Sequence, residues 1–400
     1  MKNADSETIN VVFMANFNYP HGMAGTKNVQ GYIEYLHASP NFEPAVLVLR
    51  QNRIRPVDNP LSGEYKGVPY TTIGSDIRGG FSAVFKAPKY FLQGMKFLRN
   101  RRIGGKNILY VYGYPSTDNI LLIGYARHLG YKVVFYIVED IAHQSSAPDF
   151  FARLKNRSAR LLCGMMSLFT DAALVVSSRL MKKIEGVAKG RFPVVLDPIT
   201  VDVRRYEGIA RDEHEGVHVF YGGTFGEKDG VEFLIAGFEK ACETHDNLTL
   251  ILTGQGDAGR MDKILGIVAA SPFRDRIVYK GYVSDEEYDR LLCNCDILCM
   301  TRTSSPFANA GFPYKLGEYL AAGRPVIATD VSDVRVYLED KVNALIIAPD
   351  SGTAVAEAIE YLLADRERAE RIGRAGREAA RRYFDVSVTG EQFRKLLVDL

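Results

Sequence analysis

A cation and a carboxylate stand close together in the segment SSPFANAGFPYKLGEYLAAGRPVIATD. Lys315 and Glu318 are three residues apart, which places them on neighbouring positions of one face if the segment is helical. Such a pair could be an ordinary surface ion pair, which contributes little to stability. Alternatively, Lys315 neutralises a phosphate and Glu318 accepts hydrogen bonds from the hydroxyls of a ribose. The second interpretation predicts a nucleotide site.

A short helix must position these two side chains. Pro313 suits the start of a helix and Gly323 its end. Between them Leu316 and Leu320 recur at helical spacing. Free backbone N–H groups at a helix N-terminus favour anions, so we expect the N–H groups near Phe312 to Tyr314 to face a phosphate.

A glycine loop follows the first apolar run of the chain. In NFNYPHGMAGTKNVQGYIEYL, Gly22 and Gly25 precede a helix that we expect to start near Thr26 or Lys27. Two glycines would let the backbone approach a diphosphate closely, although glycine also serves ordinary turns. We therefore keep Gly22 and Gly25 as candidate binding residues.

A second glycine run, ILTGQGDAGR, has the G-x-G-x-x-G spacing from Gly254 to Gly259 directly after a predicted strand. A dinucleotide site also needs an acidic residue at the end of the next strand to hold the ribose. That strand, RIVYK, ends at Gly281 instead. An NAD-dependent oxidoreductase is thus an alternative, and Gly254 stays a candidate contact of a nucleotide.

Short apolar runs alternate with longer segments of helical period along the whole chain, which predicts parallel sheets covered by helices. The 400 residues suit two doubly wound, Rossmann-like α/β domains facing a cleft. We expect an N-terminal domain over 1–197, a linker over 198–216 and a C-terminal domain over 217–385. The last stretch should form helices at about 353–382 and 386–400, and the second of these could pack back on the N-terminal domain.

Composition narrows the class of protein. The 50 Lys and Arg nearly balance the 48 Asp and Glu, so the net charge favours no nucleic acid partner. Neither a signal peptide nor a run of about 18 apolar residues is evident, and we expect a cytoplasmic protein. Cys293, Cys295 and Cys299 match no zinc spacing, so we predict buried thiols and no metal.

The segment around Lys315 closely resembles the donor-binding motif of glycosyltransferase family 4, retaining enzymes of the GT-B fold. YGGTFGEKDGVEFLI resembles the opening of the family's donor domain. LILTGQGD, VYKGYVSDEEYDRLLCNCDILCM and GEYLAAGRPVIATDVSDVRVYLEDKVNALIIAPDS follow in the family's order. The first half is similar to the more divergent acceptor domain, where only the glycine loop and the strand ending at Glu139 and Asp140 look familiar.

The chain departs from the family motif at its first glutamate. The family carries two glutamates eight positions apart, the first contacting the donor sugar and the second holding the ribose. Glu318 fits the second position, but Ala310 stands at the first. We expect Asn309 and the backbone of Gly311 and Phe312 to contact sugar hydroxyls instead.

A second departure concerns the diphosphate. The family tends to bind it with an Arg and a Lys on the loop after the first strand of the donor domain. Here that loop begins at Gly223, Thr224 stands at the Arg position and Lys228 lies near the Lys position. We expect Lys315 to take over this role rather than Lys228, because a cation at a helix start adds to N–H groups already aimed at the anion.

The resemblance implies transfer of a sugar from a nucleotide-diphosphate sugar, with retention at the anomeric carbon and with no metal or other cofactor. Lys315 and the helix N-terminus would stabilise negative charge that develops on the leaving diphosphate. Acid–base candidates are Glu139, Asp140 and His143, which follow an apolar strand. Asp140 could equally cap the next helix.

Two segments of the first half, FKAPKYFLQGMKFLRNRRIGGK and FFARLKNRSARLLCGMMSLF, are basic and aromatic. They could lie on an anionic membrane surface, as would suit an envelope polysaccharide or lipid-linked acceptor. Equally, they could be helices with solvated basic faces. The expected partners are thus a nucleotide sugar, a glycan or lipid-linked acceptor and, peripherally, the inner face of a membrane. A nucleotide-sugar-binding protein without transferase activity is the remaining alternative.

Overall fold

We describe the protein from a computed structural model, which covers residues 8–51, 59–74, 81–140 and 150–400. The chain forms two compact units, and each is described by itself. The N-terminal unit comprises Met1–Thr200 with Thr389–Leu400, and the C-terminal unit comprises Val201–Val388. Each unit contains a predominantly parallel sheet with helices on both faces, so the predicted α/β class with two doubly wound sheets is confirmed.

The sheet of the N-terminal unit has the strand order β3-β4-β2-β1-β5-β6-β7-β8, and only the β3–β4 pair is antiparallel. Its strands are β1 (Ile9–Ala15), β2 (Phe42–Val48), β3 (Ser62–Tyr65), β4 (Val68–Thr72), β5 (Lys106–Tyr112), β6 (Lys132–Ile137), β7 (Ala172–Val175) and β8 (Val194–Leu196). Its helices are α1 (Ala24–His37), α2 (Phe81–Arg101), α3 (Ile120–His128), α4 (Phe150–Gly164), η1 (Met166–Leu168), α5 (Ser178–Ala188) and α14 (Val386–Asp399).

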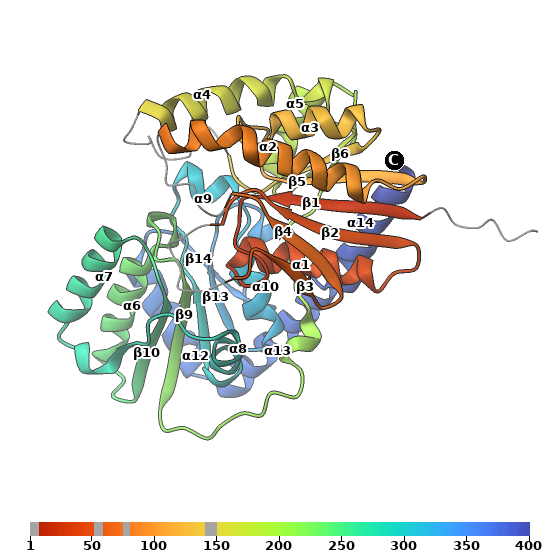
Figure 1. Cartoon of the computed structure of the whole chain (residues 1–400). Helices are drawn as coiled ribbons and strands as arrows, with labels where there is room; N and C mark the ends of the chain where they lie inside the picture. Colours follow the sequence, from red (N-terminus) through yellow and green to blue (C-terminus); the bar gives the residue numbers. More distant parts are fainter. Residues whose placement is uncertain (1–7, 52–58, 75–80, 141–149) are drawn as a thin grey trace, which may run out of the picture. The chain divides into compact units, whose positions relative to one another are not determined.

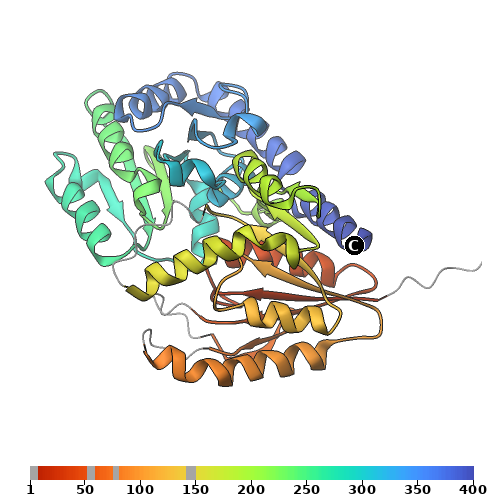
Figure 2. The same ribbon diagram turned by 90° about the horizontal axis from the view of Figure 1, so that it is seen from above.

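The central strand β1, INVVFMA, is buried along its whole length because helices cover both faces of the sheet. Helices α1 and α14 lie on one face, and α2 and α3 lie on the other (Figure 1). Phe393 of α14 packs against Phe13, Tyr32 and Tyr110 of this unit, at centroid distances of 6.2, 4.9 and 5.4 Å. The C-terminal helix therefore contributes to the core of the N-terminal unit, and its end is marked in Figure 2.

The sheet of the C-terminal unit is parallel throughout, with the order β11-β10-β9-β12-β13-β14. Its strands are β9 (Val217–Gly223), β10 (Leu248–Gly254), β11 (Ile277–Tyr279), β12 (Ile297–Met300), β13 (Val326–Thr329) and β14 (Leu345–Ile347). Its helices are η2 (Val203–Tyr206), η3 (Glu227–Asp229), α6 (Val231–Cys242), α7 (Ala258–Ala270), η4 (Arg274–Arg276), α8 (Asp285–Asn294), α9 (Pro306–Ala310), α10 (Tyr314–Ala321), α11 (Val334–Tyr337), α12 (Gly352–Leu363) and α13 (Arg366–Tyr383).

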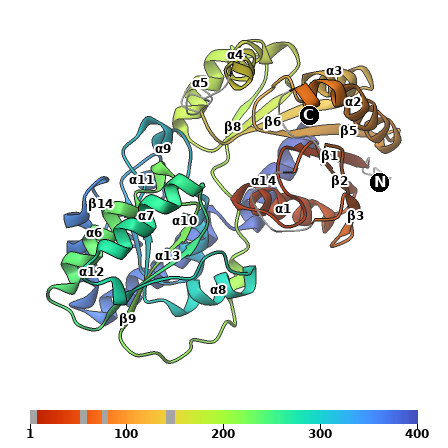
Figure 3. The ribbon, with the colours of Figure 1, turned by 60° about the vertical axis from the view of Figure 1, so that its left-hand side comes forward.

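Helices α6 and α12 pack together on one face of this sheet, and α10 packs against α13 on the other (Figure 3). Cys293, Cys295 and Cys299 are buried, as expected for small apolar side chains. None of the helices in the described part of the chain has both the length and the apolar character needed to cross a bilayer.

Candidate functional site

The candidate site lies where the strand order of the C-terminal sheet reverses, between β9 and β12. In open parallel sheets, ligands bind beyond the carboxyl ends of the strands at such a switch point. Gly223 ends β9 and Thr224 follows it, while Thr301 and Arg302 follow β12. These loops and helix α10 therefore position the side chains of the site.

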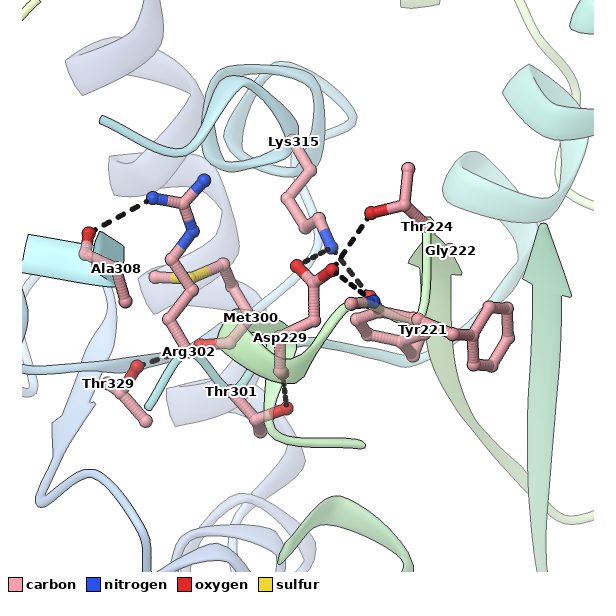
Figure 4. A network of polar contacts seen from close by, with 12 residues as sticks. Tyr221, Gly222, Thr224, Asp229, Met300, Thr301, Arg302, Ala308, Lys315 and Thr329 are labelled. Atoms are coloured by element: carbon pink, nitrogen blue, oxygen red, sulfur yellow. Dashed lines mark hydrogen bonds and ion pairs between the residues drawn. The ribbon is translucent and has the colours of Figure 1, made fainter. Parts of the chain in front are cut away.

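Lys315, in the first turn of α10, lies against the end of β9 (Figure 4). Its Nζ donates to Asp229 Oδ1 at 2.9 Å and to the Tyr221 hydroxyl at 2.8 Å. The Lys315 side chain is 13% exposed and that of Asp229 is 3% exposed. The ammonium group is thus held at the edge of solvent by a buried carboxylate that sequence reasoning did not single out.

Asp229 joins the loops that follow β9 and β12 (Figure 4). Its Oδ2 accepts hydrogen bonds from Thr224 Oγ1 and from the Gly226 amide, both at 3.0 Å. Its carbonyl accepts a bond from Thr301 Oγ1 at 3.1 Å. Thr224, at the position where the family has Arg, therefore supplies a hydroxyl that orients Asp229.

The site carries more positive than negative charge. Burial alone would raise the pKa of Asp229, but Lys315 and then Arg302 outweigh it and hold that pKa well below its usual range. Burial lowers the pKa of Lys315, with Asp229 opposing the shift and Arg302 and Lys228 adding to it. Lys315, Arg302 and Lys228 thus all act electrostatically on Asp229, and an anion entering the site would be attracted.

Arg302 is a buried cation of the site that the sequence interpretation missed. Its Nη1 donates to the carbonyls of Ala308 and Gly311, each at 3.3 Å, and so connects β12 to α9 and to the turn before α10. A signal was present, because a charged residue that closely follows a fully apolar strand at a switch point is a candidate for a site. Lys228 is only partly buried, and its ammonium lies 4.4 Å from the centre of the Phe307 ring.

Two of the predicted glycines are explained by close packing. A Cβ on Gly223 would lie 2.5 Å from Lys315 Nζ and 2.6 Å from the Tyr221 hydroxyl. Gly254 has a φ of 123°, and a Cβ there would lie 1.8 Å from the Gly223 carbonyl oxygen. Gly223 thus makes room for the ammonium, while Gly254 lets the ends of β9 and β10 approach each other.

Glu318 is buried one turn further along α10, with 4% of its surface exposed. The Tyr288 hydroxyl donates to its Oε2 at 3.5 Å. Burial and then the Glu318 carboxylate raise the pKa of Tyr206, Tyr288 and Tyr314 well above the usual tyrosine range. These phenols therefore stay neutral and can donate hydrogen bonds, with the Glu318 carboxylate as an acceptor among them.

Helix α10 begins at Tyr314, with Pro313 just before it as the N-cap. Within the described residues no side chain caps this N-terminus, and the Leu316 amide is bonded to the Pro313 carbonyl. Side chains therefore leave the backbone N–H groups at the start of α10 uncapped, close to Lys315 in the same turn.

The side chains of Asn309 and Phe312 serve the local fold. The Asn309 amide group donates to the carbonyls of Ser304 and Ser305 at 2.9 and 3.2 Å, and its Oδ1 accepts from the Ser332 amide at 2.9 Å. Phe312 is 6% exposed and packs against two other aromatic rings. The contacts of Asn309 give no support to the expectation that its side chain binds sugar hydroxyls.

The remaining candidates lie in the N-terminal unit. Helix α1 begins at Ala24, two residues before the expected start. A Cβ on Gly22 would lie 2.1 Å from Thr26 Oγ1, and one on Gly25 would lie 2.8 Å from the Tyr112 hydroxyl. Both glycines therefore have a packing role in this unit.

The acid–base candidates follow β6. Asp140 is buried and forms an ion pair with Lys183 of α5, so its carboxylate has a structural partner. Glu139 lies near enough to Tyr112 to act on it electrostatically: burial and then the Glu139 carboxylate raise the pKa of the Tyr112 hydroxyl. His143 lies outside the described residues.

Part of the C-terminal unit matches a known protein family. Residues 207–379 match the model described as glycosyl transferases group 1. A phosphatidyl-myo-inositol mannosyltransferase of Mycobacterium leprae is 30% identical over 183 residues, which are 45% of this chain and 46% of that protein. An uncharacterised glycosyltransferase of Methanocaldococcus jannaschii is 24% identical over 165 residues, 41% of this chain and 40% of that protein. The chain thus spans less than half the length of these relatives.

Solved structures share the fold over nearly the whole chain. A sucrose-phosphate synthase from Thermosynechococcus elongatus has a TM-score of 0.73 at 15% identity, covering 97% of this chain and 98% of its own. Anabaena HepE in complex with UDP and glucose has a TM-score of 0.72 at 15% identity, covering 98% and 100%. The resemblance to glycosyltransferases of the GT-B fold that the motifs indicated is confirmed.

Proposed function

We propose that this chain, a GT-B protein whose residues 207–379 match glycosyl transferases group 1, transfers a sugar from a nucleotide-diphosphate sugar with retention of anomeric configuration. The observation that carries the proposal is the cluster at the switch point of the C-terminal sheet, where Lys315 and an uncapped helix N-terminus meet in a region of surplus positive charge. A solved protein of the same fold contains UDP and glucose.

The chemical difficulty in this reaction is the negative charge that develops on the diphosphate as the bond to the sugar breaks. Preorganised cations and N–H groups stabilise such charge without reorganising during the reaction. In our proposal Lys315 supplies the cation and the first turn of α10 supplies the N–H groups. Asp229 holds the ammonium in place between turnovers through its 2.9 Å hydrogen bond. The protein's own cations would thus take the part that a metal ion plays in other transferases.

Glu318 is proposed to hold the ribose of the donor. Its side chain is a carboxylate, and hydrogen bonds to an ionised carboxylate are about twice as strong as those between neutral groups. Because the Glu318 carboxylate is buried, few water molecules can hydrate it. Hydroxyl groups of a ligand would therefore displace little water when they bind it, and the desolvation cost of binding would be small.

Glu318→Ala is expected to weaken nucleotide binding about 10- to 100-fold, the loss expected when one or two charge-assisted hydrogen bonds disappear. UDP, GDP and ADP should be screened first for an increase in melting temperature, because a ligand that binds only the folded state stabilises it. Kd for the best nucleotide is then measured by calorimetry. Glu357→Ala, an exposed change on α12, is the matched control and should leave Kd unchanged. Equal Kd values for the parent and Glu318→Ala would remove the ribose assignment.

Two other functions are separable by experiment. A protein that binds nucleotide sugars without transfer would show the same stabilisation but release no nucleoside diphosphate when a mixed glycan and lipid extract is added. An NAD-dependent oxidoreductase would be stabilised by NAD and by no nucleotide sugar. The structure favours transfer over NAD binding, because Gly254 and its neighbours are used to pack strand ends and β11 is followed by Lys280 and Gly281 rather than an acidic residue.

The acceptor is proposed to be a lipid-linked or envelope glycan reached at an anionic membrane surface. Along the end of α4 and η1, Leu161, Met165 and Leu168 are 66%, 49% and 61% exposed at helical spacing, and the neighbouring Arg157 and Arg160 are also exposed. Exposed apolar side chains beside cations suit the headgroup region of a membrane. A mannosyltransferase among the relatives carries phosphatidyl-myo-inositol in its name, which fits an acceptor of this class.

The double change Leu161→Ser with Leu168→Ser is expected to lower the partition coefficient on anionic vesicles at least about tenfold, since each buried leucine contributes about 1.5 kcal/mol or more. Vesicle co-sedimentation at low salt measures this, with Val336→Ser as the control because Val336 is a similarly exposed apolar residue of the C-terminal unit. If the parent protein stays in the supernatant, or if the control loses as much binding, the membrane contact is wrong.

A further inference from the structure

The C-terminal unit also has a basic cavity, at the opposite end of the strands from the candidate donor site. It has a volume of about 210 Å³ and its lining includes Arg211, Gly323, Arg324, Arg374 and Arg377. Gly323 and Arg324 come just before β13, with only Pro325 between, so the cavity lies at the amino end of this strand. The donor-site residues follow the carboxyl ends of β9 and β12, and the two sites are therefore distinct.

Two of the four arginines are fixed in place by hydrogen bonds to helix ends. Arg377 donates to the carbonyls of Ala321 and Ala322, both at 2.9 Å, at the C-terminus of α10. Arg324 donates from its Nε to the Cys293 carbonyl at 2.8 Å, at the end of α8. These bonds cap the two helices, and they also hold both guanidinium groups in fixed orientations.

The cavity has too few carboxylates for its cations. Among the described residues, Arg324 and Arg377 have no carboxylate within ion-pair distance, while Arg211 pairs with Asp296 and Arg374 lies 3.8 Å from Glu370. The two helix C-termini add partial negative charges of only about half an elementary charge each. Burial, the largest cause, and then Arg211 lower the pKa of Arg324, while the Asp296 carboxylate opposes the shift.

We propose that this cavity binds a small phosphate-bearing anion. Guanidinium groups match phosphate oxygens with paired, directed N–H bonds, which an ammonium group cannot do. The volume lies below the range of about 300–1,000 Å³ for drug-sized ligands, so the cavity suits inorganic phosphate or a small phosphorylated compound rather than a nucleotide sugar.

Inorganic phosphate is the probe. It is titrated to about 10 mM while chloride keeps the ionic strength constant, and the melting temperature and the calorimetric Kd are measured. We expect a saturable stabilisation of the parent protein, and a Kd at least about tenfold weaker in Arg374→Gln and in Arg324→Gln. Arg374 is 68% exposed on α13, so its replacement should leave the fold intact even if Arg324→Gln does not fold.

Two further variants locate the bound ion. Arg366→Gln, a more exposed change on the same helix, should bind phosphate like the parent. Lys315→Gln should also retain the effect, because Lys315 belongs to the donor site. The proposal is overturned if phosphate produces no saturable effect, or if the effect disappears in Lys315→Gln and persists in both Arg324→Gln and Arg374→Gln.

Discussion

Replacing Lys315 with glutamine is expected to lower kcat/KM for the donor sugar about 100- to 1,000-fold, the usual loss when one preorganised stabiliser of developing negative charge is removed. Glutamine keeps most of the side-chain length, so the change removes the charge and little else. Because Lys315 is held by Asp229 and by Tyr221, its ammonium needs no reordering before it acts. The loss should fall mainly on kcat, since the leaving diphosphate carries more charge in the transition state than in the bound donor.

The same change also affects stability, and a double variant separates the two effects. Without Lys315, Asp229 is left as a buried carboxylate lacking its partner, and breaking such a pair costs about 3–5 kcal/mol. In Lys315→Gln with Asp229→Asn both charges are absent, so most of the unfolding free energy should return while activity stays low. Recovery of activity in the double variant would mean that Lys315 acts only by balancing Asp229.

Lys228→Gln is the matched comparison for the choice between the two lysines. Lys228 is less buried, and its ammonium lies over the Phe307 ring, so we expect a loss of no more than about tenfold for this variant. The two lysine variants are compared by their initial rates of nucleoside diphosphate release. A larger loss in Lys228→Gln than in Lys315→Gln would reverse the assignment of the diphosphate cation.

The fold was predictable because its signals are local and repeated. Each long buried strand is an apolar run of the expected length, as in INVVFMA for β1. The hairpin of β3 and β4 lacks this signal, because strand β3 is largely exposed and has no apolar pattern. The helix expected over residues 353–382 is two helices, since Asp365 accepts a hydrogen bond from the Arg368 amide and starts α13.

The candidate site was predictable only in part. Lys315 and Glu318 could be found because their spacing on one helix is visible in the chain. Asp229 and Arg302 could not be assigned to Lys315 from the sequence, since they reach it only when β9 and β12 become neighbours in the sheet. Pairing between strands that are distant in the chain decides which charges meet, and no spacing pattern records it. The contacts of Asn309 were unpredictable for the same reason, because Ser332 is 23 residues away.

The second large effect that we expect is a dependence of stability on pH set by Asp197, which follows β8 in the N-terminal unit. The Tyr32 hydroxyl donates to its Oδ2 at 2.6 Å, and the Tyr136 hydroxyl donates to its carbonyl at 3.2 Å. Burial raises the pKa of Asp197 to about 7, with the Tyr32 hydrogen bond acting in the opposite direction. The folded protein therefore keeps this carboxyl protonated in a range where the unfolded chain has lost the proton.

The sign of the effect follows from linkage. The folded-state pKa of Asp197 is raised, so its contribution to stability is complete below the unfolded pKa of about 4 and is lost as pH rises to about 7. Three pKa units correspond to about 4 kcal/mol at 1.36 kcal/mol per unit. Between about pH 5 and pH 8, the unfolding free energy of the parent minus that of Asp197→Asn should fall by about 3 kcal/mol.

Urea unfolding at several pH values measures this difference. Taking the difference between parent and variant removes the contribution of other titrating groups, such as Glu232. Burial would raise the pKa of Glu232, but its hydrogen bond with Arg260 outweighs burial and the pKa is lowered to about 2. Glu232 therefore affects stability in the opposite sense, at low pH. Asp262→Asn, an exposed change on α7, should run parallel to the parent throughout. If the curve of Asp197→Asn instead runs parallel to that of the parent from about pH 5 to pH 8, Asp197 is ionised in the folded protein, because in this range only a proton retained on folding makes the difference between the two curves change with pH.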